Sequence, residues 1–485
     1  MSNNSILSAT KWSAITNILS KITSPIANVF LARLLTPEAF GVVATINLVI
    51  TFADIFTDAG FQKYLIQHEF DDENHLLKST NVAFWSNFTL SIISWLIIFI
   101  FRNNLAKLVG SEGYGIHLTI AAFSIPLLSF SSIQQALYKR NYNFKGLFIP
   151  KLIRSIVPLV ITVPLACYFH NCWALIIGTL TVHVSDAILL TVKSKWKPSF
   201  YYSLIEFKEM FSFSFWTLLE TIAIWLTGNV DVFIIGKNLN QYYLGIYKTA
   251  SLTVSQITSI IVTTIIPVLF TSLSRNQKDD EKFKMIFSSF QNKCAIILVP
   301  LSFGIFIYRN LVTRVLLGSQ WNDATLFIGL IGLYQFILIL ICYFASEVYR
   351  SKGNPKVSFI VQVIDIVVSG VIIFIASSKS FELLCYAKII TLILFALMHI
   401  FVLATIFHFN ILKLSKNFVV PLICSVVMSI FAHFLLRWHS EIYWQFIEIF
   451  ICIVIYFTLY MCFPKERKEV VLIIKKYSLR KQNHV

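Results

Sequence analysis

Two carboxylates, Asp54 and Asp58, stand inside a largely apolar stretch, TINLVITFADIFTDAGF, at residues 45–61. Their spacing of four places them on one face of a helix, where Asn47 and Thr51 continue the polar stripe. A charge at mid-bilayer costs about 2.5–3.5 kcal/mol on insertion scales, so such residues usually face a water-filled interior or a partner. The chemistry that this pattern favours is the carriage of a proton or a sodium ion.

A second polar stripe precedes the first. It repeats at i, i+4, i+7 and i+11 and therefore shares one helical face: Asn17, Lys21, Ser24 and Asn28. Lys21 is a point charge suited to a phosphate group. For the uncharged side chains the alternative is hydrogen bonding between neighbouring helices. For the charged side chains the alternative is a structural ion pair between Lys21 and Asp54.

The second half of the chain carries similar stripes. One expected helix presents Glu220, Thr227 and Asp231 on a single face. The next presents Lys248, Ser251, Ser255 and Thr258. We expect these stripes and the first two to face one cavity, in which Lys21 and Lys248 hold an anion. Glu220 and Asp231 join Asp54 and Asp58 as candidates for ion coupling.

Isolated charges occur in other apolar segments. Arg154 and Lys293 lie near the ends of their segments, so they either line the cavity or extend to lipid headgroups. Asp186, with His183 nearby, is embedded in another segment.

The sequence offers no site for catalysis, metal or cofactor. It contains no P-loop, GxSxG or HExxH motif. The acidic and histidine-rich stretch QHEFDDENH, residues 67–75, matches no ligand spacing, and a solvated cytoplasmic loop is expected. The eight cysteines form no CxxC pair. Cys167 and Cys172 either pair in an oxidising compartment or, as we expect, remain buried free thiols.

The composition predicts an all-α integral membrane protein. The chain has 485 residues, of which 57% are hydrophobic and 13% charged, and its mean hydropathy is +0.74. About fourteen segments are long enough to cross a bilayer as helices. They lie at 12–34, 40–62, 80–101, 116–137, 147–169, 173–192, 210–236, 243–271, 285–307, 323–349, 357–377, 382–407, 418–436 and 443–463.

The net charge of +16 follows the membrane topology and gives no indication of nucleic-acid binding. With the N-terminus inside, 26 of the 33 Lys and Arg residues outside the expected spans fall on the cytoplasmic side. This asymmetry places both termini in the cytoplasm. The basic loops then contact anionic membrane lipids.

An internal repeat organises the expected spans. At an offset of 204 residues Trp12 matches Trp216, and the turns LLTPEAFG and NLNQYYLG align with Gly41 opposite Gly245. The two copies begin six membrane crossings apart, so both enter the membrane from the same side. They are therefore parallel repeats. We expect a six-helix lobe at 1–208, a second at 209–410, a central cavity and two appended helices with a basic tail at 411–485.

Residues 10–100 resemble a known family. The run LARLLTPEAFGVVATINLVITFADIFTDAGFQKYLIQ, followed by DENHLLKSTNVAFWSN, is similar to bacterial Wzx-type polysaccharide exporters. These are flippases of the multidrug/oligosaccharidyl-lipid/polysaccharide superfamily. Beyond residue 200 the resemblance lies in span count and repeat.

The resemblance implies fourteen spans, two lobes and a hydrophilic, often cationic, cavity in the bacterial cytoplasmic (inner) membrane. It implies that an undecaprenyl-pyrophosphate-linked oligosaccharide, such as an O-antigen, capsular or exopolysaccharide repeat unit, is moved to the outer leaflet. Some members are coupled to an ion gradient, and other polysaccharide-assembly membrane proteins are candidate partners.

A flippase is therefore the function we expect. The alternatives are a multidrug cation antiporter of the same superfamily, a membrane-embedded polymerase or glycosyltransferase, and an uncoupled lipid scramblase. The short outer loops argue against an enzyme, which usually needs a sizeable segment outside the membrane.

Overall fold

The computed structural model describes residues 3–58, 60–141, 143–194, 196–438, 441–464 and 467. Within these ranges, the side chains of residues 3–18, 213–217, 220 and 355 lie outside the description. The described residues form helices and no strand, as the sequence predicts. The chain divides into two compact units: unit 1 is Met1–Thr249, Leu316–Gln320 and Ser369–Leu383, and unit 2 is Ala250–Val315, Trp321–Val368 and Leu384–Val485.

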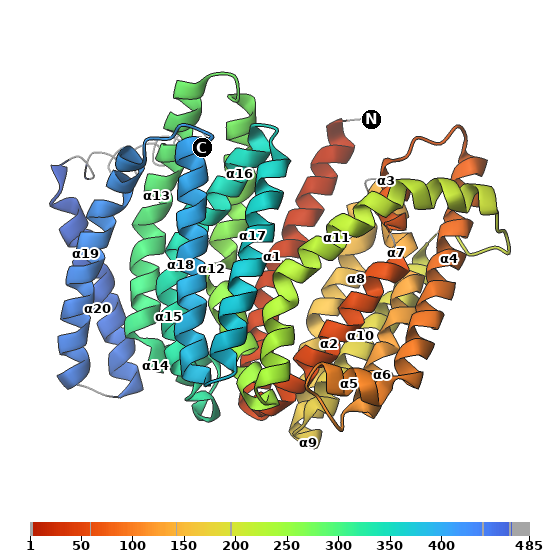
Figure 1. Ribbon diagram of the computed structural model, residues 1–485, viewed down its shortest axis with the longest axis horizontal. Coiled ribbons are helices and arrows are strands. Elements are labelled where there is room, and N and C mark those ends of the chain that lie inside the picture. The colour runs from red at the N-terminus through yellow and green to blue at the C-terminus, as the bar shows by residue number, and fades with distance from the viewer. Residues whose placement is uncertain are drawn as a thin grey trace. The chain divides into compact units, whose positions relative to one another are not determined.

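Unit 1 is built from the first eleven α-helices and the start of the twelfth (Figure 1). Their bounds are α1 Asn3–Leu34, α2 Pro37–Asp58, α3 Phe61–Gln67, α4 Glu73–Ile100, α5 Arg102–Leu108, α6 Gly115–Ala122, α7 Ser124–Arg140, α8 Phe144–Val157, α9 Val163–Phe169, α10 Cys172–Lys193, α11 Leu204–Asn238 and α12 Gln241–Arg275. A π-helical turn, η1, links α8 to α9 at Pro158–Thr162.

Unit 2 holds most of the remaining helices. Their bounds are α13 Asp280–Ile307, α14 Arg309–Leu316, η2 Ser319–Trp321, α15 Ala324–Ile337, η3 Leu338–Tyr343, α16 Phe344–Ser351, α17 Pro355–Ser377, α18 Phe381–Thr405, α19 Ile411–Trp438 and α20 Ile442–Met461. Here η2 is a 3₁₀ turn, which lies partly in unit 1, and η3 is a second π-helical turn.

Twelve helical segments of the described chain are long and apolar enough to cross a membrane. An all-helical integral membrane protein is therefore confirmed. The helices α1 and α11 are 32 and 35 residues long, and both contain residues whose side chains lie outside the description. The count of fourteen spans and the lobe boundaries at residues 208 and 410 stay predictions.

The sequence pattern did not predict the π-helical turns inside two of the spans. The turn η1 begins at Pro158, whose ring cannot continue an ordinary helical ladder. No proline lies in η3, but Gln291 on α13 donates from Nε2 to the Leu340 carbonyl at 3.1 Å. A side chain that enters the ladder in this way satisfies a carbonyl of the widened turn.

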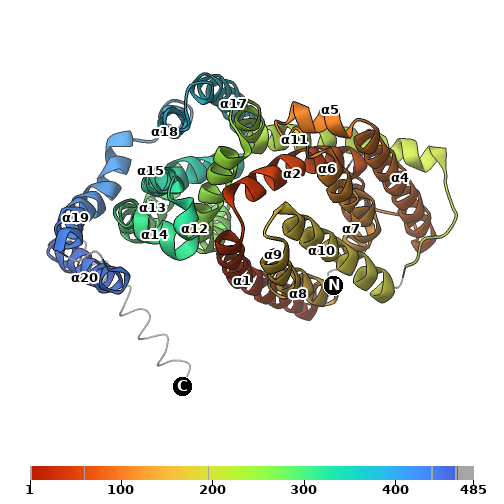
Figure 2. The same cartoon turned by 90° about the horizontal axis from the view of Figure 1, so that it is seen from below.

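In unit 1, α10 lies at the centre and contacts α2, α6, α7 and α8 (Figure 2). Apolar side chains of α2, α6 and α10 form one core, and those of α3, α4 and α7 form another. The first part of α11 lies across the end of this bundle, next to α3 and α4, before the helix turns to run beside α2 (Figure 1).

The two repeated turns contact each other through glycine within unit 1. A Cβ atom on Gly41 would lie 1.8 Å from the Gln241 carbonyl oxygen, and one on Gly245 would lie 1.8 Å from that of Pro37. Pro37 and Gln241 are themselves 204 residues apart, so the contact is symmetrical with respect to the repeat. Only glycine lets two backbones approach so closely.

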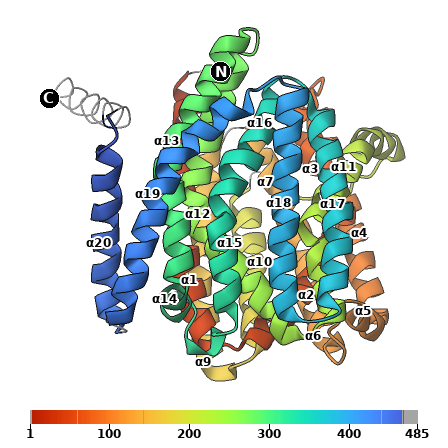
Figure 3. The same ribbon diagram turned by 60° about the vertical axis from the view of Figure 1, so that its left-hand side comes forward.

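In unit 2, α13 packs between α15 and α19, and α20 lies beside α19 (Figure 3). Tyr456 of α20 donates from its hydroxyl to the Ile296 carbonyl of α13 at 2.9 Å. The last two helices are thereby fixed to α13 through a buried contact.

Candidate functional site

The carboxylates of α2 are held by neutral partners. Thr57 donates to Asp54 Oδ1 at 3.1 Å, and Gln62 Nε2 donates to Asp58 Oδ1 at 3.1 Å. Both acids are half-buried, and neither forms an ion pair with a described residue. The alternative of a structural Lys21–Asp54 ion pair is therefore wrong for this structure. Lys63 and Lys139 act on Asp58 only at longer range. Two carboxylates on one helical face without a direct cation partner are suited to take up a cation or a proton.

The stripe on α2 also contacts α11. Trp225 Nε1 donates to the Thr51 hydroxyl at 3.0 Å, and the Trp225 ring lies 4.9 Å from that of Phe52. By the repeat offset Trp225 is the equivalent of Lys21, so the two repeats place different chemistry at this position. The side chains of Trp12 and Trp216 lie outside the described part of the chain.

The neighbouring helices α1 and α8 carry two cations at the same height along their axes. Ser20 and Ser155 share a hydrogen bond of 2.9 Å between their hydroxyls. Lys21 follows Ser20 and Arg154 precedes Ser155, so this bond places both cations at the same height along adjacent helices. Lys21 is half-buried and has no ion pair among the described residues. Lys151, one turn before Arg154, adds a third cation that the sequence analysis did not select.

Arg154 is bound on one side by Asp186 of α10. Its Nε donates to Asp186 Oδ2 at 2.8 Å, and its terminal nitrogen contacts the same oxygen. Asp186 is 1% exposed, whereas the Arg154 side chain is 46% exposed. The sequence identified both charges without pairing them. Arg154 therefore does not depend on headgroups for a partner, and its open side remains available to an anion.

We expect Arg154→Ala to destabilise the protein by about 3 kcal/mol, because it leaves a carboxylate buried without its partner. The measurement is the thermal unfolding midpoint of the purified protein. The double variant Arg154→Met, Asp186→Leu removes both charges and should recover most of the loss. An unchanged midpoint for Arg154→Ala would show that the pair adds no stability.

The candidates of the second half of the chain lie on α11, α12 and α13. Tyr247 donates to Asp231 Oδ2 at 2.5 Å, and the Val232 amide donates to Oδ1. Lys248 is half-buried. Lys293 is exposed on α13 of unit 2.

Three other candidates remain predictions. Asn28 is half-buried on α1. The side chains of Asn17 and Glu220 lie outside the described part of the chain.

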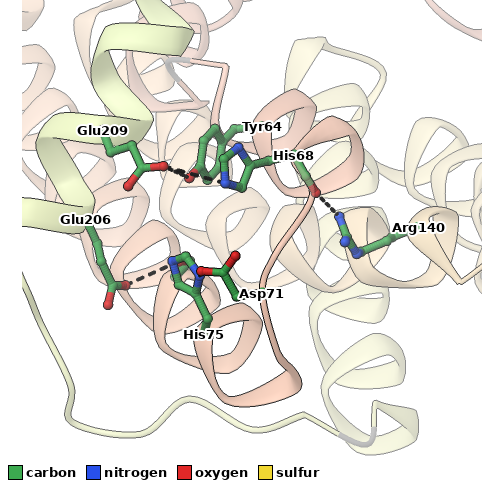
Figure 4. Close-up of polar contacts among 8 residues, drawn as sticks. Tyr64, His68, Asp71, His75, Arg140, Glu206 and Glu209 are labelled. Carbon is green, nitrogen blue, oxygen red and sulfur yellow. Dashed lines mark hydrogen bonds and ion pairs between the residues drawn. The ribbon is translucent and has the colours of Figure 1, made fainter.

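Residues 67–75 are largely exposed, as expected of a solvated loop, but neighbouring helices also contact them. Figure 4 shows His68 and Tyr64 directed toward Glu209 of α11, with Oε1 of Glu209 at 3.5 Å from His68 Nε2 and 3.1 Å from the Tyr64 hydroxyl. Arg140 donates to the carbonyls of Leu65 and His68. Burial and the Glu209 carboxylate raise the pKa of Tyr64 above its ordinary value, so its hydroxyl stays protonated and donates.

The described residues contain no group of three side chains that could hold a metal ion. Cys167 and Cys172 are both free thiols, but only Cys172 is buried; the expected burial of Cys167 is wrong, because Cys167 lies exposed near the end of α9. The candidate site therefore consists of charged side chains carried by membrane-spanning helices.

The model of a family described as "Polysaccharide biosynthesis protein" matches residues 30–326. The chain is 27% identical over 320 residues to the succinoglycan biosynthesis transport protein ExoT of Rhizobium meliloti (strain 1021), a match covering 66% of this chain and 63% of ExoT. It is 21% identical over 352 residues to the lipopolysaccharide biosynthesis protein WzxC of Escherichia coli (strain K12), covering 72% of this chain and 68% of WzxC. The chain thus matches a little under two thirds of the length of ExoT.

Among solved structures, the chain is similar to the lipid II flippase MurJ in an inward closed conformation. The TM-score is 0.74 at 16% sequence identity, and the match covers 93% of this chain and 98% of MurJ. This likeness shows a shared fold.

Proposed function

The chain belongs to the family of polysaccharide biosynthesis proteins, and on that premise we propose that it moves a lipid-linked oligosaccharide across the membrane. The substrate class is an undecaprenyl-pyrophosphate-linked repeat unit of an O-antigen, capsule or exopolysaccharide. The names of ExoT and WzxC, which concern transport and polysaccharide biosynthesis, support this choice over a multidrug antiporter or a glycosyltransferase.

The observation that carries the proposal is the pair of cations on α1 and α8. A pyrophosphate cannot enter hydrocarbon unaided, because an unpaired charge there is costly. Lys21 and the open side of Arg154 lie at one level and offer a point charge and a guanidinium fork to such a group. Lys248 and Lys293 are candidates for contacting the pyrophosphate at a later stage of transport. Asn17 and Asn28 are candidates for hydrogen bonds to the glycan.

The coupling role falls to the carboxylates of α2. Asp54 and Asp58 have neutral hydrogen-bond partners and no direct ion pair among the described residues, although Lys63 and Lys139 act on the charge of Asp58 at longer range. Each can therefore bind H⁺ or Na⁺ without first breaking an ion pair. Glu220 and Asp231 are further candidates. No cofactor is required besides the ion gradient.

The chain is a multi-pass membrane protein. We propose that its membrane is the bacterial cytoplasmic membrane, with both termini in the cytoplasm. The excess of Lys and Arg on the inner side supports this orientation. Other polysaccharide-assembly membrane proteins are proposed partners.

We expect Lys21→Ala to lower surface polysaccharide about tenfold in a strain that depends on this protein, since it removes one charge-assisted contact to the pyrophosphate. Surface polysaccharide is measured by immunoblot alongside the amount of folded protein. The control is Lys145→Ala, which removes an exposed lysine at the start of α8 and should change nothing. Unchanged polysaccharide with Lys21→Ala would refute the role of Lys21.

A further inference from the structure

A polar cavity of about 550 Å³ lies within unit 2, and none of the proposed substrate or ion-coupling residues lines it. It is bounded by the first turns of α13, the turn at 406–410 and the first turns of α19. The helices α13 and α19 lie side by side in Figure 3. Both helices are long and apolar enough to cross a membrane, and the cavity lies at their N-terminal ends, where we expect the lipid headgroups. Its volume is in the range of small-molecule sites.

The floor of the cavity is a fixed hydrogen-bond network. Gln291 is 2% exposed and is oriented by its bond to the Leu340 carbonyl in the π-helical turn η3. Asn417 of α19 then donates to Gln291 Oε1 at 3.0 Å and to the Ser288 hydroxyl at 2.9 Å. Side chains held in this way form a preorganised polar surface rather than an adaptable one.

The charge lining the cavity is positive. Lys284 of α13 and Lys413 of α19 both line it, and neither has an ion pair among the described residues. Glu281 is the only carboxylate among the lining residues.

The two acids that precede Glu281 are occupied elsewhere. Asp279 caps α13 by accepting from the Lys282 amide at 3.0 Å, and Asp280 pairs with Lys352 at 2.5 Å. The balance therefore favours an anion with several acceptor oxygens.

The turn between α18 and α19 brings His408 to the rim of the cavity. His408 has φ 52°, a left-handed conformation that usually costs a non-glycine residue free energy and is common at ligand sites. Phe409 fixes the turn: its ring lies 5.0 Å from that of Phe287, and its amide donates to the Leu403 carbonyl at 2.9 Å. The imidazole is thus held at the cavity by a buried anchor.

We propose that this cavity binds the phosphate group of a membrane lipid headgroup, with Lys284 and Lys413 contacting the phosphate oxygens. Free phosphate has the same chemistry, but two exposed apolar side chains favour a lipid. Met285 lines the cavity and is 68% exposed, and Leu412, next to Lys413, is 77% exposed. Both can contact an acyl chain while the headgroup occupies the polar cavity.

The test uses the full-length protein purified in detergent. The probes are dihexanoylphosphatidylglycerol and, separately, inorganic phosphate, and binding is followed by thermal stabilisation and by native mass spectrometry. We expect the lipid to stabilise the protein and the double variant Lys284→Ala, Lys413→Ala to weaken its binding at least about tenfold, since two charge-assisted contacts are lost.

Two single variants keep the test decisive if the double variant folds poorly. Glu281→Gln removes the only lining carboxylate and should strengthen binding about threefold. Lys416→Ala, an exposed lysine of α19 that does not line the cavity, should leave binding unchanged. Equal effects of Lys416→Ala and the double variant, or stabilisation by inorganic phosphate as strong as by the lipid, would overturn the proposal. Transport is not measured here, so the result is independent of the proposed function.

Discussion

Replacing Gly41 by alanine is expected to abolish transport and to lower the thermal unfolding midpoint. The new Cβ would lie 1.8 Å from the Gln241 carbonyl oxygen and 2.7 Å from its carbon, and both are backbone atoms that cannot rotate away. Overpacking of this kind costs about 1–3 kcal/mol even where the surroundings relax. Gly245→Ala should have the same effect, because Gly245 meets Pro37 at the same distance.

The control for this prediction is Gly228→Ala in α11, where a Cβ would meet nothing within 4 Å. That variant should be neutral or slightly stabilising, because alanine is the better helix former. A cysteine in place of Ser111, which is buried beside Thr45, reports on the same contact. It should become reactive to a water-soluble maleimide in Gly41→Ala. Normal transport by that variant would show that the glycine contact can open without consequence.

Asp54→Asn should reduce transport about tenfold or more while leaving the folded protein within about 1 kcal/mol of its normal stability. Asparagine keeps the shape of the side chain and an oxygen that can still accept from Thr57. It loses only the charge that would bind H⁺ or Na⁺. The measurements are transport at equal protein level, its response to the ion gradient, and the unfolding midpoint.

Glu38→Gln provides the control for Asp54→Asn, since Glu38 is an exposed carboxylate in the first turn of the same helix. It should change neither transport nor stability. If Asp54→Asn lost folded protein in proportion to transport, the role of Asp54 would be structural.

Much of the fold followed from the sequence because lipid restricts the backbone to helices. The carboxylate stripe of α2 and the paired turns around Gly41 and Gly245 were visible as spacing and repetition. Spacing shows which residues share a face.

The contacts across helices could not be predicted in the same way. Arg154 and Asp186 belong to consecutive spans, yet nothing in either span fixes their relative height. The turn η3 contains no proline, and one of its carbonyls accepts from Gln291, about fifty residues earlier in the chain. Residues 67–75 are contacted by Arg140 and by Glu209, which approach from α7 and α11. Such partners are distant in sequence and are chosen by packing.

The most direct measurement is translocation of a polyprenyl-pyrophosphate oligosaccharide by the purified protein in liposomes, followed by access of an added glycosidase to the glycan. We expect the protein to move the lipid-linked glycan between leaflets. The Lys21→Ala variant, folded to the same extent as the unaltered protein, should move it about tenfold more slowly. Translocation at the same rate by both proteins, or none above protein-free liposomes, would contradict this expectation.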